Sequence, residues 1–301
     1  MKRTRYSIAL FALTLLAGLL LAGAWPGAAA TVPGVCPLET SPRLPQLPER
    51  LHGSIRSVRT GAKVLALTFD LCEGAKETAG YDEALVDYLR AHDVKATFFA
   101  GGKWLRSHPQ QAMQLLADHR FEIGNHGWSH RNLRQLTGQA LADEIDLAQA
   151  ELTALRDRQS ALACAKPAES AALAPRAESL PLFRFPYGTC SLEALAYVNA
   201  RGLAAIQWDV VTGDPDRAQS AEAIARTVLR EAHPGAIVVA HANGRGWHTA
   251  AALPLLIPQL RAKGYRLVTV SELLAMGEPV AVGECFERTP GDNRHYDRGK
   301  R

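Results

Sequence analysis

The sequence predicts an α/β protein in which a parallel sheet of about seven strands closes into a single-domain (β/α) barrel. Between residues 63 and 276, short apolar runs alternate with amphipathic stretches in seven strand-then-helix units, a pattern typical of parallel sheets. Polar residues stand at the ends of several runs, where such barrels carry their catalytic groups. An open, doubly wound sheet would have a glycine-rich first turn, whereas the first turn here reads LCEGAKE.

The first half of the alternation predicts three strands and two helices. VLALTFD predicts a strand over 64–70, and YDEALVDYLRA predicts a helix over 81–91 because its apolar residues recur on one side. KATFFA predicts a strand over 95–100, and a helical stretch over 109–117 follows it. FEIGN then predicts a strand over 121–125.

A long helix is expected next, over 137–156. Its leucines and isoleucine fall in helical register, and Thr137 is a suitable N-cap. Residues 159–180 then break the alternation, because they are rich in alanine, include two prolines and show no amphipathic stripe. We interpret them as an insertion that enters just before the next strand, and we expect it to cover the site and restrict the choice of substrate.

The alternation resumes at residue 182 and continues to residue 275. The strands expected here are the apolar runs at 182–185, 204–210, 236–240 and 266–270. One helix is expected to begin at Ser191, and the others are expected over 221–231, 250–263 and 271–275. These elements complete the seven units.

The two ends of the chain lie outside this pattern. Residues 1–30 resemble a signal peptide, with a basic start, an apolar run over 8–21 and small residues at Ala28-Ala29-Ala30, so we expect an exported protein. The alternative is an uncleaved membrane anchor. Residues 31–62 predict an N-terminal extended arm, and residues 277–301 a solvated, poorly ordered C-terminal tail.

The charge balance excludes one class of partner. The chain has 34 basic and 30 acidic side chains, and the expected leader holds three of the basic ones and no acid. The remainder is nearly neutral, which disfavours a nucleic-acid-binding protein. Nothing in the sequence indicates a stable protein partner.

Five cysteines leave at least one thiol unpaired within the monomer. Export permits disulfides, but their connectivity does not follow from one sequence. Cys164 with Cys190 would bracket the insertion, and Cys36 with Cys285 would tie the two ends together. Cys72 would then be free, and a nucleophilic role for it has little support because no motif supplies a matched base.

The strand-end residues that could carry chemistry include one acid and a pair of histidines. Asp70 ends the run VLALTFD. His126 and His130 lie four apart in GNHGWSH, a spacing at which two imidazoles can hold one metal. Two solvated loop histidines are the alternative for such a pair.

Further candidates come from the second half of the alternation. Arg184 in FRFPYG could pair with Asp70 and keep it ionised, and the following turn could present the Tyr187 N–H to an oxyanion. In QWDVVTGDP, one acid would be a cap or loop residue and the other, for which we favour Asp214, would orient Arg184 or a histidine. His241 ends an apolar strand and is either a buried structural group or a general acid.

The order of these motifs resembles the polysaccharide deacetylase family, carbohydrate esterase family four. TFD, NHGWSH, FRFPYG, WDVVTGD, a strand that ends in histidine and GYRLVTVSEL follow one another between Lys63 and Met276. The resemblance implies a distorted (β/α) barrel, a divalent metal that is most often zinc, and hydrolysis of N-acetyl groups on amino sugars. The implied partner is an N-acetylated glycan, such as peptidoglycan or a chitin-like polymer.

The resemblance also implies a role for each matched residue. Asp70 would be the general base, and His126 and His130 would be metal ligands. Three further residues would complete the machinery: Arg184, which orients the base, Tyr187, which helps to form the oxyanion site, and His241, the general acid.

One departure from the family pattern affects the metal. Leu71 stands where the family's motif has an aspartate that binds the metal. We expect Glu73 to take over as the third ligand, with Glu77 or water as alternatives. A third possibility is a protein that has lost the metal and binds glycans without cleaving them, and a related C–N hydrolase of a small amide is a further alternative.

Overall fold

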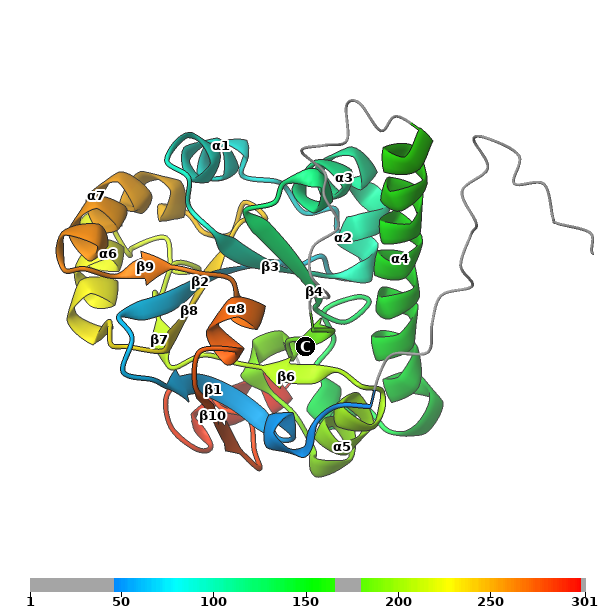
Figure 1. Cartoon of the computed structure of the whole chain (residues 1–301). Helices are drawn as coiled ribbons and strands as arrows, with labels where there is room; N and C mark the ends of the chain where they lie inside the picture. The colour runs from blue at the N-terminus through cyan, green and yellow to red at the C-terminus, as the bar shows by residue number, and fades with distance from the viewer. Residues whose placement is uncertain (1–45, 166–179, 299–301) are drawn as a thin grey trace, which may run out of the picture. The chain divides into compact units, whose positions relative to one another are not determined.

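The computed structural model describes residues 46–165 and 180–298 (Figure 1). By its contacts the chain divides into two units, residues 1–35 and 36–301, and all the described residues belong to the second. None of the helices in the described ranges combines the length and apolar character that a bilayer span requires.

Seven strands form a closed barrel, the architecture that the sequence predicts. Their order around it is β1 (Ser54–Arg59), β6 (Ala204–Ile206), β5 (Leu182–Phe183), β4 (Phe121–Asn125), β3 (Ala96–Ala100), β2 (Val64–Leu71) and β8 (Ala236–His241). Neighbours in this order pair in parallel, and a single antiparallel bridge between Ser57 of β1 and Ala236 of β8 closes the barrel.

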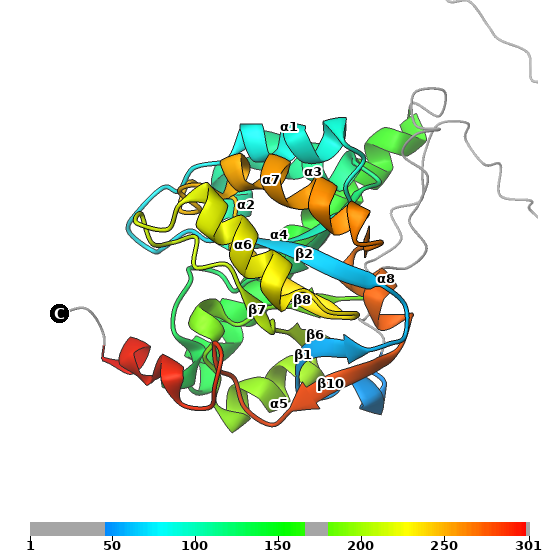
Figure 2. The same ribbon diagram turned by 90° about the vertical axis from the view of Figure 1, so that its left-hand side faces the viewer.

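Three short strands extend the sheet. β7 (Val210–Val211) pairs in parallel with β8, and β9 (Arg266–Leu267) pairs in parallel with β2. β1 therefore takes part in the barrel in place of the strand expected over 266–270, which pairs outside the barrel order as β9. β10 (Glu278–Val282) runs antiparallel along β1, and Figure 2 shows the two side by side.

Helices cover the outside of the barrel. Those expected from the sequence are α1 (Glu83–Ala91), α3 (Pro109–Ala117), α4 (Gly138–Ala165), α5 (Leu192–Ala200), α6 (Ala221–Glu231), α7 (Thr249–Ala262) and α8 (Val270–Leu274), and α2 (Gly102–Ser107) is an addition. Single-turn or short 3-10 segments are η1 (Glu49–Leu51), η2 (Leu133–Gln135), η4 (Pro186–Gly188) and η5 (Asp292–Asp297). Figure 1 places α6 and α7 on one side of the strands and α4 on the other.

The alternation of side chains along β2 decides which residues face the site. Leu65, Leu67, Phe69 and Leu71 pack into the apolar layer between the strands and the helices. Val64 and Ala66 belong instead to a separate apolar cluster. Because successive side chains of a strand point to opposite faces, Asp70 lies on the face opposite Leu71.

The structure corrects the predictions for the two ends of the barrel. Part of the predicted N-terminal arm, residues 54–59, is strand β1, and the described part of the predicted tail folds against the barrel as β10 and η5. Arg56 of β1 donates hydrogen bonds to the carbonyl oxygens of Phe286 and Glu287. Asn293 in η5 is fully buried.

Three element boundaries also differ from the prediction. The strand expected over 204–210 is divided into β6 and β7, and the strand expected over 266–270 ends at Leu267, where α8 soon follows. Helix α4 continues to Ala165, so the first residues of the predicted insertion are helical. Residues 166–179 of that insertion, and with them the expected cover over the site, lie outside the described residues.

One disulfide ties the C-terminal segment to the barrel. It joins Cys190, which follows η4, to Cys285, which follows β10. Both predicted pairings are therefore wrong, because each assigned one of these two cysteines to a different partner. The prediction that Cys72 is free is confirmed, and its thiol is buried.

Removing this disulfide is expected to destabilise the protein. Because the bond closes a loop across 95 residues of sequence, the Cys190→Ser variant should lose about 2–5 kcal/mol of unfolding free energy, measured by urea denaturation. Cys285→Ser should show the same loss, and the double variant should add little to either. Unfolding midpoints equal to that of the parent protein would contradict a structural role for the bond.

Candidate active site

Two ionisable residues stand next to each other at the carboxyl ends of adjacent strands. In the parallel register of β2 and β8, Asp70 pairs with His241. Residues paired in this way project from the same face of a sheet, so both side chains reach the same end of the barrel. The structure thus brings together the two residues that the sequence analysis assigned as base and acid.

Asp70 is held by Arg184, as predicted. The Arg184 Nη1 donates to Asp70 Oδ1 at 2.8 Å, and its other nitrogens donate to the carbonyl oxygens of Ile206 and Gln207. Arg184 is fully buried and Asp70 is only 4% exposed. Burial alone would raise the pKa of Asp70, but the charge of Arg184 and of two nearby histidines holds this pKa below its ordinary value. Asp70 is therefore an ionised, oriented carboxylate.

His241 has an equally well-defined partner in Asp214. Its Nδ1–H donates to Asp214 Oδ1 at 3.0 Å, and its backbone N–H donates to Oδ2 at 2.7 Å. The hydroxyl groups of Thr212 and Thr249 also donate to the Asp214 carboxylate. Burial lowers the pKa of His241, but Asp214 outweighs this effect and raises the pKa well above its ordinary value. Asp214 is thus a positioning residue for His241.

The other acid of the same segment has a different place. Asp209 accepts from His233 Nε2 at 2.7 Å and from the Ile237 N–H at 3.0 Å. Its partners hold the start of β8, so Asp209 is the loop acid of the two alternatives.

His126 presents one nitrogen to the site. Its Nδ1–H donates to the Arg184 carbonyl oxygen at 2.9 Å, which leaves Nε2 as the nitrogen directed toward the other side. Nε2 lies 3.5 Å from Asp70 Oδ2 and 3.5 Å from Cys72 Sγ. The His130 ring centre is 5.1 Å from that of His126. This pair of imidazoles fits the requirement for two neutral nitrogen donors on one ion.

Cys72, expected from the sequence only as a free thiol, occupies a central position in the site. Among the described residues, two groups of donor atoms lie close enough to hold a metal: Cys72 with His126 and His130, and Cys72 with Asp70 and His241. Cys72 belongs to both. Burial raises the pKa of its thiol, but His130 and His126 outweigh burial and bring the pKa well below its ordinary value. The signal was present in TFDLC, because residues 70 and 72 share a face of an extended strand.

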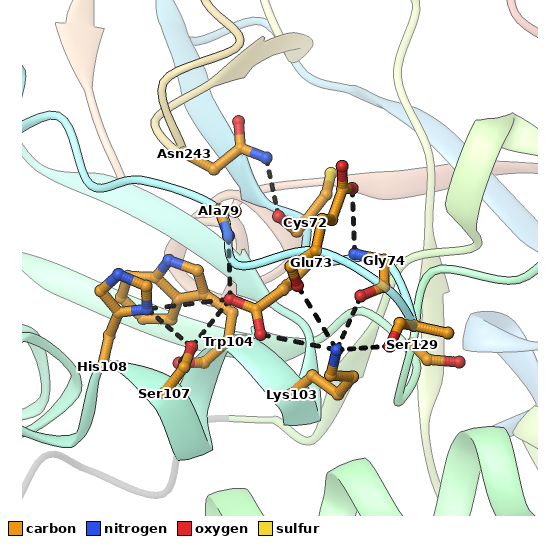
Figure 3. A network of polar contacts seen from close by, with 12 residues as sticks. Cys72, Glu73, Gly74, Ala79, Lys103, Trp104, Ser107, His108, Ser129 and Asn243 are labelled. Carbon is orange, nitrogen blue, oxygen red and sulfur yellow. Dashed lines mark hydrogen bonds and ion pairs between the residues drawn. The ribbon is translucent and has the colours of Figure 1, made fainter.

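The structure corrects the prediction for Glu73, which belongs to neither group. Its Oε2 accepts from the Ala79 N–H at 3.1 Å and from Ser107 Oγ at 2.8 Å, and Lys103 Nζ lies 3.8 Å from Oε1. Figure 3 shows the carboxylate directed toward α2, away from the Cys72 thiol. One residue further along the chain reverses the direction of the side chain, so Glu73 anchors the loop after β2. Glu77, the alternative ligand, pairs instead with Arg245.

Tyr187 lies beside the histidines and has an unusual backbone conformation. Both Tyr187 and His130 have positive φ angles, 58° and 55°, which non-glycine residues rarely adopt outside functional or tight-turn positions. The Tyr187 ring packs between two other rings. Its centre lies 4.4 Å from that of His130 and 4.9 Å from that of Tyr296 in η5. Tyr296 belongs to the segment predicted as a tail, so its place beside the site was missed.

Comparisons with known protein sequences point to one family. The model of the polysaccharide deacetylase family matches residues 57–168. A chitooligosaccharide deacetylase of Bradyrhizobium sp. is 30% identical over 71% of this chain and 92% of its own length. The uncharacterised protein YlxY of Bacillus subtilis is 28% identical over 64% of this chain, and the match spans only about half, 53%, of that relative.

Two solved structures bear on the site. The peptidoglycan N-acetylglucosamine deacetylase Bc1960 is 25% identical, with a TM-score of 0.62 over 75% of this chain and 95% of its own. BA3943 of Bacillus anthracis, described as a pseudoenzyme of carbohydrate esterase family four, is 26% identical, with a TM-score of 0.59 over 73% of this chain and 68% of its own. A mutant of BA3943 is described as having restored enzymatic activity.

Proposed function

The chain belongs to the polysaccharide deacetylase family, and from this premise we propose that it removes N-acetyl groups from amino sugars of a polysaccharide. Peptidoglycan and chitin-like glycans are the two substrate classes, since the relatives are named for one or the other. We propose that the reaction depends on a divalent metal, and that zinc is that metal.

The observation that carries this proposal is the paired arrangement of base and acid. Asp70 and His241 are neighbours in the register of β2 and β8, and each has a buried partner that fixes its charge. Their pKa values are shifted in opposite senses, to an ionised carboxylate and a protonated imidazole. Such a pair can take one proton and give another in the same turnover.

The residues of the chain divide the work of amide hydrolysis. Asp70 accepts the proton of the attacking water, while Arg184 keeps this carboxylate oriented. His241 protonates the departing amine through Nε2, while Asp214 holds the imidazole by its Nδ1–H. The Tyr187 backbone N–H donates to the developing oxyanion. His126 and His130 would hold a divalent ion, which would lower the pKa of a bound water and polarise the acetyl carbonyl.

A second candidate function is supported by Leu71. A leucine at the family's metal-binding position is compatible with a protein that binds glycans without cleaving them, and the similar BA3943 is described as a pseudoenzyme. Against this, Asp70, Arg184, Asp214 and His241 form two buried charged pairs, which sugar binding alone does not require. Hydrolysis of a small amide remains a third alternative.

Acetate release discriminates among these functions. The purified protein, supplied with zinc, should release acetate from N-acetylated chito-oligosaccharides or from peptidoglycan glycan strands, and His126→Ala should lose both activity and bound metal. Glycan binding without acetate release would favour the silent alternative. Turnover of small N-acetyl amines but of no glycan would favour the amide hydrolase.

The Asp214–His241 pair predicts the alkaline limb of the pH profile. His241 acts in its protonated form, so kcat/KM falls as the pH rises through its raised pKa. In Asp214→Asn the imidazole keeps a hydrogen-bond acceptor but loses the carboxylate charge. We expect the pKa of His241 to fall and the alkaline limb to move to lower pH.

Asp209→Asn is the matched control for this experiment. It removes a carboxylate of the same segment whose histidine partner, His233, is a different one. Its alkaline limb should coincide with that of the parent protein. An unshifted limb in Asp214→Asn would assign that limb to a group other than His241.

We also propose that the protein is exported with cleavage after Ala30, a segment outside the described residues. The Cys190–Cys285 disulfide supports this proposal, because such bonds persist in oxidising compartments. N-terminal sequencing of the protein recovered from the cell exterior or periplasm should begin at Thr31, whereas a retained leader would indicate an anchored protein.

A further inference from the structure

We propose that Cys72 is the third protein ligand of the metal, in a Cys–His–His site with His126 and His130. This inference rests on the proposed function, since it concerns the ion at the same site. In this site the thiolate of Cys72 takes the place of the carboxylate that is missing at position 71. The expected site keeps one position open, as a catalytic zinc with three protein ligands does.

The strand geometry places Cys72 where a ligand is needed. Leu71 is fully buried in the apolar layer under the helices, together with Phe69. Asp70 and Cys72 flank it and share the opposite face, so the base and the thiol enter the site together. A side chain at position 73 faces away again, as the contacts of Glu73 show.

The distances suit a shared ion. Zinc–sulfur and zinc–nitrogen bonds at a tetrahedral angle separate the two donor atoms by about 3.5 Å. In the structure, Cys72 Sγ and His126 Nε2 are 3.5 Å apart. The donor atoms of Cys72, His126 and His130 all lie within 4.8 Å of one another.

The hydrogen-bond pattern calls for a cation at this point. Because the His126 Nδ1–H is committed to the Arg184 carbonyl, Nε2 is the ring nitrogen directed into the site. It faces the Cys72 sulfur and, at 3.5 Å, the Asp70 carboxylate. Several acceptors that converge on one point require a positive centre between them. A proton would satisfy one pair of these acceptors, whereas a divalent ion can be bound by all of them at once.

The loop holds the sulfur in place without help from the ion. Asn243 Nδ2, from the loop after β8, donates to the Cys72 carbonyl oxygen at 2.8 Å. On the other side, Glu73 is fixed by Ala79 and Ser107, and Lys103 donates to the Gly74 carbonyl oxygen at 2.7 Å (Figure 3). The Cys72 thiol, only 3% exposed, is thus anchored at both flanks.

A competing assignment makes Cys72 a nucleophile. Cys72, His241 and Asp214 have the identities of a thiol, a base and an orienting acid. His241 also lies within donor distance of the sulfur, so distance alone fits both assignments. Ligation is favoured because the sulfur is buried and two further imidazoles, His126 and His130, converge on it. A thiolate ligand also changes the metal preference, since soft sulfur favours zinc and cobalt over magnesium or manganese.

Cobalt substitution tests the inference independently of activity. The full-length protein is reconstituted with Co²⁺, and the near-ultraviolet absorption due to thiolate-to-cobalt charge transfer is recorded together with the metal content by mass spectrometry. The parent protein should bind one equivalent and show the charge-transfer band. Glu73→Gln, which alters the neighbouring residue and keeps its hydrogen-bond acceptor, is the matched control and should show the same band.

The variants at position 72 carry the decisive comparison. Cys72→Ser should lose the band and bind zinc at least about 10-fold more weakly. Cys72→Asp should lose the band and retain a metal, because a carboxylate is also a zinc ligand. Cobalt bound to the parent protein without the band, or zinc bound equally well by Cys72→Ser, would overturn the inference. An acetyl thioester on Cys72 in a metal-free, active protein would establish the nucleophile instead.

The two proposals fail separately in this design. A cobalt protein that shows the band but never releases acetate from a glycan retains the Cys–His–His site and refutes the deacetylase function. Acetate release by a zinc protein whose cobalt form lacks the band retains the deacetylase function and refutes Cys72 as a ligand.

Discussion

Asp70→Asn is expected to lower kcat by about 10²- to 10⁴-fold, the range typical for loss of a general base. The asparagine oxygen can still accept the hydrogen bond from Arg184, but the amide cannot accept a proton from water. Because the histidines are unchanged, the variant should keep its metal. Steady-state kinetics on an N-acetylated glycan and metal analysis of the same sample measure the two effects.

Two results would change the interpretation of this variant. Full activity in Asp70→Asn would remove Asp70 from the role of base. Loss of the metal together with activity would indicate that Asp70 holds the ion, a geometry that its 3.5 Å distance from His126 Nε2 allows. A thermal unfolding curve shows whether the variant has instead lost stability, because Arg184 loses its charged partner in it.

Arg184→Met should have the largest effect on stability. Arg184 is fully buried, and its removal leaves the buried Asp70 carboxylate without its principal partner. Breaking a buried pair in this way typically costs about 3–5 kcal/mol. Unfolding in urea measures the loss, and turnover should fall as well because the base loses its orientation.

The pH dependence of the stability loss in Arg184→Met identifies the cause of that loss. The folded-state pKa of Asp70 lies below its unfolded value, so the pair stabilises the protein above the unfolded pKa and loses this contribution as the pH falls through the folded one. The stability gap between Arg184→Met and its parent should therefore narrow in acid. Adding Asp70→Asn to Arg184→Met should recover part of the loss at neutral pH. A gap independent of pH and of Asp70 would instead indicate lost packing against Phe99.

The parts of the fold that follow from local sequence were predictable. β2, β3, β4 and β8 are mostly apolar segments of five or more residues that end on or beside polar groups, and the expected ranges agree with the structure closely. Asp70, His126, Arg184 and His241 were assigned from the same local patterns. The pairing of Arg184 with Asp70 could be anticipated because both ends of the ion pair stand at strand termini.

The remaining features depend on contacts between distant segments. β1 and β10 lie more than 200 residues apart. β1 has a polar sequence although most of it is buried, and no position of β10 is fully buried, so neither has the pattern of a core strand. The Cys190–Cys285 bond follows from that pairing, so it could not be chosen from spacing. The signal that distinguishes Cys72 from Glu73 is strand alternation, which places position 72 on the side of Asp70 and position 73 on the opposite side.

The register of β2 and β8 has a consequence for how such a site can diverge. The separation of Asp70 and His241 is set by backbone hydrogen bonds between two strands, so it survives substitutions in the neighbouring loops. Cys72, in contrast, stands just beyond the end of β2. We therefore expect a substitution at position 72 to change the preferred ion of the proposed metal site, while Asp70 and His241 keep their separation. Under the proposed assignments, metal preference and acid–base chemistry depend on different parts of this barrel and can change independently of each other.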